Sequence, residues 1–484
     1  MSTTNFEWIY LSNFKRREKM AKYKDIASDI RDKIITGDWF YGMKIPSHRQ
    51  LAIQYNVNRV TIIKSIELLE AEGFIYTKVG SGTYVNDYLN EAHITNKWSE
   101  MMLWSSQQRS QYTVQLINKI ETDDSYIHIS KGELGISLMP HIQLKKAMSN
   151  TASHIEDLSF GYNNGYGYIK LRDIIVERMS KQGINVGREN VMITSGALHA
   201  IQLLSIGFLG QDAIIISNTP SYIHSTNVFE QLNFRHIDVP YNQINEINTI
   251  IDRFINFKNK AIYIEPRFNN PTGRSLTNEQ KQNIITYSER HNIPIIEDDI
   301  FRDIFFSDPT PAIKTYDKLG KVIHISSFSK TIAPAIRIGW IVASEKIIEQ
   351  LADVRMQIDY ESSILSQMVV YEMLKNKSYD KHLVKLRYVL KDKRDFMLNI
   401  LNNLFKDIAH WEVPSGGYFV WLVFKIDIDI KYLFYELLSK EKILINPGYI
   451  YGSKEKSIRL SFAFESNENI KHALYKIYTY VKKV

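Results

Sequence analysis

Residues 326–340 of this chain read SSFSKTIAPAIRIGW, directly after the apolar run VIHI. A short Ile/Val-rich run of this kind is typical of a buried strand, so Lys330 is expected just past a strand end. Ser327 and Ser329 flank the lysine, and Arg337 follows seven residues later. Hydroxyl and guanidinium donors of this sort hold a phosphate monoester, while a lysine amine forms a Schiff base with an aldehyde. A lysine taken alone is most often a solvated surface residue, but these neighbours favour the chemical role.

Other short apolar runs precede this one: VMITS (191–195), AIIIS (213–217), AIYIEP (261–266) and IPIIEDD (293–299). Helical patterns separate them, which predicts a mostly parallel sheet covered on both faces. Ligands of such sheets bind at the carboxyl ends of the strands. The polar residues expected there are Ser195, Tyr222, Asn270, Asp298 and Lys330. The Ser-Gly of TSGALHA also lies at a strand-to-helix turn, where a helix N-terminus can receive an anion.

Residues 125–484 resemble the fold-type I aminotransferases, which are α/β proteins dependent on pyridoxal 5′-phosphate (PLP). Four segments carry the resemblance, in family order: FNNPTG (268–273), IEDDIF (296–301), SSFSKTIAPAIRIGW (326–340) and IRLSF (458–462). The resemblance implies that Lys330 forms the internal aldimine and that Asp298 pairs with the pyridine nitrogen; these are the two catalytic residues expected.

The same resemblance implies roles for the remaining site residues. Asn270 would bond the phenol oxygen of the ring, Tyr222 would stack on the ring, and Arg459 would bind an effector carboxylate as a bidentate pair. Tyr162 would reach the phosphate of the partner subunit. The phosphate would be held within one subunit by Ser195, Gly196, Ala197, Ser327 and Arg337.

One departure concerns the residues after Asp298. The family usually has a Tyr two or three positions later, but this chain has Ile300 and Phe301. Cofactor binding survives such a loss better than efficient catalysis does. We therefore expect transamination to be weak or absent.

The N-terminal part shows a different pattern. Ile26, Ile30 and Ile34 recur every four residues and predict an amphipathic helix. Ser47 and Asn58 can cap two further helices, and β-type pieces at 74–78 and 83–85 flank Gly80-Ser81-Gly82. Three helices and a small β-ribbon predict a winged helix-turn-helix, an α+β domain, over residues 22–85.

This module resembles the GntR family of regulators through YKDIASDIRDKIITGDW, GMKIPSHRQLAIQYNVNRVTI and LEAEGFIYTKVGSGTYV. Arg59 and Lys64 share one side of the recognition helix, so that side can enter a major groove. The resemblance implies DNA contacts by Arg49, Asn58, Arg59, Thr61, Lys64 and Gly80.

A GntR-type head on an aminotransferase-like body is the arrangement of the MocR subfamily. It implies a homodimeric regulator, activator or repressor, that binds double-stranded promoter DNA and responds to PLP or an amino compound. From Met43 onward the resemblance to one branch of the subfamily also implies control of multidrug efflux genes.

Bulk properties agree with a folded protein. Hydrophobic residues make up 44% and charged residues 23%, and the net charge of +7 suits a nucleic-acid partner as well as ordinary solvated charge. No apolar run is long enough to cross a bilayer, no secretion signal is seen and there is no cysteine, so we expect a cytoplasmic protein without membrane partner or metal site. The expected division is an unassigned extension (1–21), the head (22–85), a linker (86–124) and the aminotransferase-like domain (125–484).

Two other functions stay open at this point. The chain could be a working aminotransferase with an accessory DNA-binding head, since Lys330, Asp298 and Arg459 are retained. It could also be a DNA-binding protein with an empty, vestigial pocket. An absorbance band that depends on Lys330 would separate the last alternative from the others.

Overall fold

The computed structural model describes residues 22–31, 33–34, 39, 42–78, 80–86, 112–154, 161, 164–226, 228–229, 234–307 and 310–482. The chain divides into two compact units, Met1–Ser105 and Ser106–Val484. We call the described part of the first the head and that of the second the large unit. Tyr162, the extension 1–21 and most of the expected linker lie outside the described residues. No helix within the described ranges has both the length and the apolar character needed to cross a membrane.

The head is the predicted winged helix-turn-helix. Residues 22–31 and 33–34 are helical, and α2 (His48–Gln54) and α3 (Arg59–Ala71) follow. Ser47 and Gln50 form a capping box at the start of α2, because each side chain bonds the other residue's backbone N–H. The strands β1 (Ile75–Lys78) and β2 (Gly82–Val85) pair antiparallel to form the wing. The turn needs Gly80 and Gly82, whose φ angles are +76° and +125°.

One apolar core holds the head together. Ile26, Ile30 and Ile34 of the first helix are at most 6% exposed and pack in the same cluster as Ile62 and Leu69 of α3, among other residues. The four-residue spacing places the three isoleucines on one face of the helix. The first helix is therefore an integral part of the fold of the head.

The large unit is organised around a seven-stranded mixed sheet with strand order β3-β9-β8-β7-β6-β4-β5. Only β9 runs antiparallel to its neighbours. Five of the strands are the runs expected from the sequence, whereas β5 and β9 were not expected. The bounds are β3 Val191–Thr194, β4 Ile214–Thr219, β5 Arg235–Pro240, β6 Lys260–Ile264, β7 Ile295–Asp298, β8 Val322–Ser327 and β9 Gly339–Val342.

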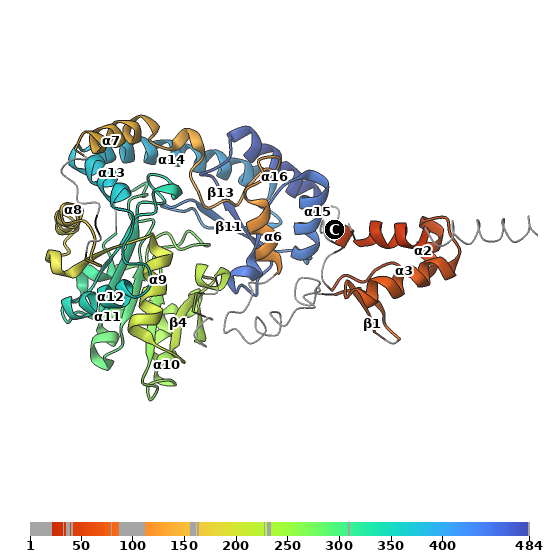
Figure 1. The fold of residues 1–484 in the computed structure, drawn as a ribbon, viewed down its shortest axis with the longest axis horizontal. Helices are drawn as coiled ribbons and strands as arrows, with labels where there is room; N and C mark the ends of the chain where they lie inside the picture. The colour runs from red at the N-terminus through yellow and green to blue at the C-terminus, as the bar shows by residue number, and fades with distance from the viewer. Residues whose placement is uncertain are drawn as a thin grey trace, which may run out of the picture. The chain divides into compact units, whose positions relative to one another are not determined.

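Helices cover both faces of this sheet. Alternate strand residues belong to two separate clusters: Ile215 and Ile323 pack with α9 (Ala197–Leu204) and α12 (Glu345–Met356), and Ile214 and Ile295 pack with α10 (Ile247–Asp252) and α11 (Asn278–His291). Burial on both faces explains why these strands are continuous apolar runs without alternation. Figure 1 shows the helices around the sheet.

A second layer completes the large unit. A four-stranded antiparallel sheet has the order β10-β11-β13-β12, with β10 Ala409–His410, β11 Phe419–Phe424, β12 Asn446–Pro447 and β13 Ser457–Ser461. Helix α14 (Ser378–Leu404) packs against α16 (Asn467–Val481), and α16 packs against α15 (Ile430–Glu441) (Figure 1). Helix α13 (Ile364–Lys375) packs on α7 (His141–Ser153) and α8 (Ile169–Ser180).

The large unit begins earlier in the chain than residue 125. Helix α6 (Tyr112–Ile120) falls within the expected linker, yet it belongs to the large unit. Val114, Leu116 and Ile117 are each at most 8% exposed there, and the Thr113 hydroxyl lies 3.1 Å from that of Tyr449. The apolar side chains of α6 lie on one face of the helix, and that face is buried against the large unit. The average polarity of residues 86–124 hides this face, so the segment resembles a linker.

Candidate functional site

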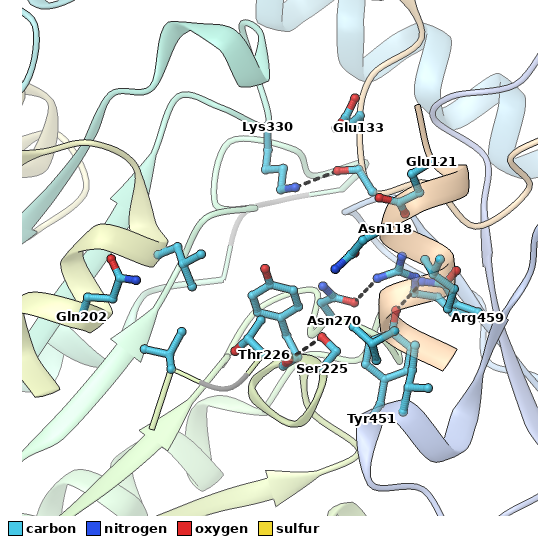
Figure 2. A pocket seen from close by; sticks show the side chains of 18 residues that line it. Asn118, Glu121, Glu133, Gln202, Ser225, Thr226, Asn270, Lys330, Tyr451 and Arg459 are labelled. Carbon is cyan, nitrogen blue, oxygen red and sulfur yellow. Dashed lines mark hydrogen bonds between the residues drawn. The ribbon is translucent and has the colours of Figure 1, made fainter. Parts of the chain in front are cut away.

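A cavity of about 580 Å³ in the large unit contains Lys330. Lys330 follows the carboxyl end of β8, as the sequence predicts, and its Nζ donates to the carbonyl oxygen of Gly132 at 2.7 Å (Figure 2). Removal from bulk water lowers the pKa of Lys330 to about 8, with Arg459 acting in the same direction. The carboxylates of Glu133 and Glu121 act in the opposite direction. A neutral, nucleophilic amine is therefore accessible near neutral pH.

Asp298 ends β7 and lies in the buried interior. Its Oδ2 accepts a hydrogen bond of 2.7 Å from the hydroxyl of Tyr263, whereas its Oδ1 is buried and has no hydrogen-bond partner in the described part of the chain. Burial raises the pKa of Asp298 to about 6. A protonated ring nitrogen would provide the countercharge that Oδ1 lacks.

Asn270 and Arg459 meet in the cavity from different layers of the fold. Asn270 follows β6, and Arg459 lies on β13 of the smaller sheet. Arg459 donates from Nη1 to the Asn270 side-chain oxygen at 2.8 Å and from Nη2 to the Ser130 carbonyl oxygen at 2.6 Å. The guanidinium also lies over the rings of Phe419 and Tyr451, at 4.3 Å and 5.1 Å from their centroids. These contacts fix the side chain that is expected to bind a carboxylate.

The expected phosphate-binding residues surround the start of α9. Gly196 is the N-cap with φ +89°, and no side chain caps the helix. Arg337 donates to the carbonyl oxygen of Ser195 at 2.8 Å. A Cβ atom on Gly196 would lie 2.9 Å from the Arg337 guanidinium, so glycine keeps this approach open. A second cavity of about 430 Å³ is lined by Ser195 and Arg337 and shares Leu198 and Gln202 with the Lys330 cavity.

Three further expected residues, Ser327, Tyr222 and Ala197, belong to the same unit. Ser327 ends β8, and its hydroxyl bonds Ser329 Oγ at 3.1 Å and the Ile338 carbonyl oxygen at 3.0 Å. Tyr222 lines the Lys330 cavity, and burial raises its pKa to about 12, so it stays a neutral phenol. Ala197 is the first residue of α9. Tyr162 lies outside the described residues, so its expected role stays a prediction.

Several cavity residues were not found by the sequence reasoning. Asn118 and Glu121 come from α6 and the residue after it, Gly132 and Glu133 from the following loop, and Tyr451 from the segment after β12. A Cβ atom on Gly132 would lie 3.8 Å from Lys330 Nζ and 3.9 Å from Arg459, so this residue borders the space between the two cations. The single signal for this in the sequence is a glycine in KGELG (131–135), which is too common a feature to indicate a site.

The departure after Asp298 is packed into the interior. Ile300 and Phe301 are 9% and 1% exposed. Phe301 makes edge contacts with Tyr418 and Phe419, whose ring centroids lie 5.0 Å and 5.7 Å from its own. An apolar side chain thus occupies the position where the family usually has a phenol.

Three buried side chains of β7, β8 and the residue after β7 lie close together: Glu297, Asp299 and His324. Glu297 accepts from the backbone N–H of Ile313 at 2.6 Å and from His324 Nδ1 at 2.9 Å, and Asp299 is paired with Arg267. Although burial opposes it, the contact with His324 holds the pKa of Glu297 at about 2. These groups are already partnered, and they support the strand that carries Asp298.

Three of the expected DNA contacts of the head are exposed cations. Arg49 on α2 and Arg59 and Lys64 on α3 are exposed, and within the described part of the head they make no hydrogen bond or ion pair. Asn58 caps α3 by accepting from the Thr61 backbone N–H at 2.9 Å and from its hydroxyl at 2.7 Å. Thr61 is 8% exposed, so its hydroxyl serves the helix start. Val60, which is 60% exposed, is an additional apolar group on this face.

The two units match two families. Residues 22–85 match the model of bacterial regulatory proteins of the gntR family, and residues 131–477 match that of aminotransferase class I and II. The HTH-type transcriptional regulator NorG of Staphylococcus aureus (strain USA300) is 99% identical over 442 residues, which are 91% of this chain and all of that protein. The chain belongs to the HTH-type transcriptional regulators that join a gntR-family head to an aminotransferase class I and II domain, the MocR arrangement.

More distant similarities agree. The HTH-type transcriptional regulator YdfD of Bacillus subtilis is 37% identical over 476 residues, covering 97% of this chain and 98% of its own length. Among solved structures, a multiple substrate aminotransferase from Thermococcus profundus has a TM-score of 0.74 at 22% identity, over 80% of this chain and 99% of that one. LysN from Thermus thermophilus, an α-aminoadipate aminotransferase, has a TM-score of 0.71 at 23% identity, over the same shares. These structures show the fold of the large unit.

PLP is the cofactor expected of such a domain, and the cavity fits it. Among the described residues Asp298 Oδ1 is a buried acceptor without a partner, the uncapped start of α9 and Arg337 can receive a phosphate, and the amine of Lys330 faces the cavity. The donor set therefore matches each polar end of the cofactor.

Proposed function

We propose that this chain is a homodimeric transcriptional regulator that binds promoter DNA through its head and PLP through Lys330, and that an amino compound bound in the same cavity changes DNA binding. One observation carries the regulatory part. Helix α6, the first described element after the head, lines the Lys330 cavity through Val114, Ile117 and Asn118. A ligand that contacts α6 acts on the segment of chain that leads to the head.

The polar residues in and around the cavity have separate tasks in this proposal. PLP, when bound, supplies an aldehyde that reacts reversibly with amines. Lys330 provides the amine that holds it, and Asp298 keeps a proton on the ring nitrogen. Asn270 donates to the phenol oxygen, and Tyr222 covers the ring. The start of α9 with Arg337 and Ser327 binds the phosphate, and Arg459 orients the carboxylate of an incoming amino compound.

Symmetric association is supported by exposed apolar side chains. Ile142 on α7 is 82% exposed and Leu365 on α13 is 44% exposed, and these two helices pack against each other. Exposed apolar side chains on two packed helices offer area that a second copy of the chain can bury. A symmetric dimer would present two recognition helices to two half-sites. Sedimentation of the PLP-bound protein at micromolar concentration is expected to show a dimer, and a monomer would contradict the proposal.

The regulatory proposal is tested with purified full-length protein. Bound duplexes are first selected from a random DNA pool, and affinity for the selected site is then measured with and without PLP and a panel of amino compounds. We expect a visible PLP absorption band and a change in DNA affinity with at least one compound. Unchanged DNA affinity across the panel would contradict regulation through this cavity. Control of multidrug efflux genes and a cytoplasmic location stay predictions.

A working aminotransferase is the second candidate, because Lys330, Asp298 and Arg459 lie in and around one cavity. The apolar packing of Phe301 at the usual phenol position argues against efficient turnover. Single-turnover spectra with the same panel distinguish the two functions. Rapid and complete conversion of the cofactor to its amine form would favour the enzyme.

A further inference from the structure

The wall of the Lys330 cavity formed by α6 carries an acidic group without a partner. Glu121 directly follows α6, and Figure 2 shows Asn118 and Glu121 extending toward the space between Lys330 and Arg459. Glu133 also lines the cavity, but it has a cationic partner, Lys131, whose Nζ lies 3.7 Å from its Oε2. Within the described ranges the Glu121 carboxylate makes no hydrogen bond or ion pair, although it lies close enough to raise the pKa of Lys330.

Occupation of the cavity changes the balance of charge around Glu121. Once the Lys330 amine is engaged by the cofactor, Arg459 is the other cation of the cavity lining, and a ligand carboxylate pairs with it. Lys131 remains committed: its Nζ lies 3.7 Å from Glu133 and donates to the Glu121 backbone oxygen at 2.8 Å. The half-buried Glu121 carboxylate is then left without an ion-pair partner among the described residues, and a ligand that fills the cavity removes part of its remaining hydration. Such a group is costly to desolvate unless the ligand provides a partner.

We propose that the effector is an amino acid with a second amine on its side chain, of the lysine or ornithine class, and that Glu121 binds this second amine. The inference rests on the proposed function, in which Lys330 holds PLP and the cavity admits an amino compound. The ligand carboxylate pairs with Arg459, its α-amine faces the Lys330 end, and its side-chain ammonium faces Glu121. An apolar side chain leaves Glu121 unpaired, and an acidic side chain places two like charges together.

The same contact gives the cavity a specific route to α6. Glu121 is joined to the helix, and its backbone N–H donates to the Ile117 carbonyl oxygen at 2.8 Å. The other end of α6 is held by the contact between the hydroxyls of Thr113 and Tyr449. A ligand ammonium group paired with Glu121 therefore contacts the residue that follows the C-terminal turn of α6. An amino acid without that group makes no such contact.

The test compares ligands that differ in the second amine. Full-length, dialysed PLP-bound protein is titrated with L-lysine, L-ornithine, L-norleucine and L-2-aminoadipate while cofactor absorbance and circular dichroism are recorded. Norleucine has the carbon skeleton of lysine without its side-chain amine. We expect lysine to bind about tenfold more tightly than norleucine, as for a charge-assisted hydrogen bond, and aminoadipate to bind most weakly.

Two variants test whether the preference for lysine over norleucine comes from Glu121. Glu121→Gln is expected to bring the affinities for lysine and norleucine together, mainly by weakening lysine. Asp124→Asn removes the same charge from an exposed residue three positions later and is expected to keep the preference.

The outcomes separate the two proposals. Equal affinities for lysine and norleucine in the native protein, or a preference that survives Glu121→Gln, would overturn the inference while leaving the regulatory function intact. A PLP-bound protein whose spectrum responds to no amino compound would overturn the effector part of the proposed function, and the inference with it.

Discussion

The recognition helix α3 and the Lys330 cavity both present cations, but in opposite environments. Arg59 and Lys64 on α3 are exposed, and no pairing within the described head holds them in place. Arg459 in the cavity is 5% exposed and is held by two hydrogen bonds and two aromatic rings. Exposed cations keep their hydration and attract phosphates over a distance that salt shortens. Enclosed cations are positioned in advance and select a ligand by shape and charge.

The two environments determine what each unit can sense. DNA affinity of the head depends on ionic strength and is shared among several side chains. A single substitution in the head should therefore change DNA affinity modestly. Ligand binding in the cavity depends on one or two side chains, and no other group can replace them. We therefore expect larger effects from substitutions in the cavity than from substitutions on the surface of the head.

Loss of the Lys330 amine is expected to abolish covalent attachment of PLP. Lys330→Ala removes the nucleophile that faces the cavity, and the described cavity lining holds no second lysine. Mass spectrometry of borohydride-reduced protein is expected to show the cofactor mass on the native chain and none on the variant. Lys346→Ala, at an exposed position of α12, is the matched control and is expected to keep the label. A label on another lysine of the native protein would refute the assignment.

Removal of residues 1–42 is expected to unfold the head while leaving the cavity intact. The deletion takes Ile26, Ile30, Ile34 and Trp39 from a core in which each is at most 8% exposed. Burial of each such side chain contributes about 1.5–3 kcal/mol, and a small domain has only a few kcal/mol in reserve.

The measurement has two readings on the same truncated protein. DNA binding should be lost, and rapid proteolysis of the head should accompany that loss, while the PLP band persists. Lys24→Ala, an exposed change on the same helix, should leave both unchanged. DNA affinity equal to that of the full chain would show that the first helix is dispensable.

Much of this contrast was predictable from the sequence, and the reasons differ between the units. The strands that carry Asp298 and Lys330 are buried on both faces, so they are continuous apolar runs that stand out from their surroundings. Strand β5, RHIDVP, has mostly exposed and half-buried residues, and β9 begins at the end of the motif that contains Lys330, so neither stands out. The first helix of the head was predictable because its three isoleucines share one spacing.

The acidic wall of the cavity was not predictable, because no local pattern marks it. Glu121 lies in a polar stretch that reads as a linker, and its neighbour in space, Arg459, is more than three hundred residues away. The pairing of Tyr263 with Asp298 has the same character, since it joins adjacent strands β6 and β7 through side chains. Spacing within a motif predicts a residue's role, whereas its partners come from the packing of the whole unit.

The rate of PLP attachment is expected to depend on pH with a break near 8. The neutral amine is the reactive form, and the pKa of Lys330 is lowered from 10.5 to about 8. Below the break the neutral fraction, and with it the rate, should rise about tenfold per pH unit, and above it the rate should level off. Stopped-flow absorbance after mixing PLP with cofactor-free protein measures this.

The substitution Glu133→Gln tests the electrostatic contribution to the pKa of Lys330. The Glu133 carboxylate raises the pKa of Lys330, so Glu133→Gln should move the break to lower pH. A rate that continues to rise up to pH 10 in the native protein would show that the amine titrates like a solvated lysine.

The smallest expected effects concern how the head reads DNA. Arg59 is the first residue of α3, where an exposed guanidinium can make a bidentate contact with guanine O6 and N7. Arg59→Ala should cost about 1–3 kcal/mol at the selected site and much less on random DNA. Arg49 lies on α2, which in this type of fold crosses the sugar-phosphate backbone, so it should position the head without reading sequence.

Titrations of both variants on selected and random duplexes at several salt concentrations separate the two roles. Arg49→Ala should weaken binding to both duplexes by a similar factor and reduce the slope of log affinity against log salt by about one, because one fewer counterion is released. Arg59→Ala should lower the ratio of specific to non-specific affinity. If Arg59→Ala weakened both duplexes equally while Arg49→Ala weakened only the selected one, the two roles would have to be exchanged. The contrast with the cavity would still stand, since either arginine acts from solvent and its contribution falls as salt is added.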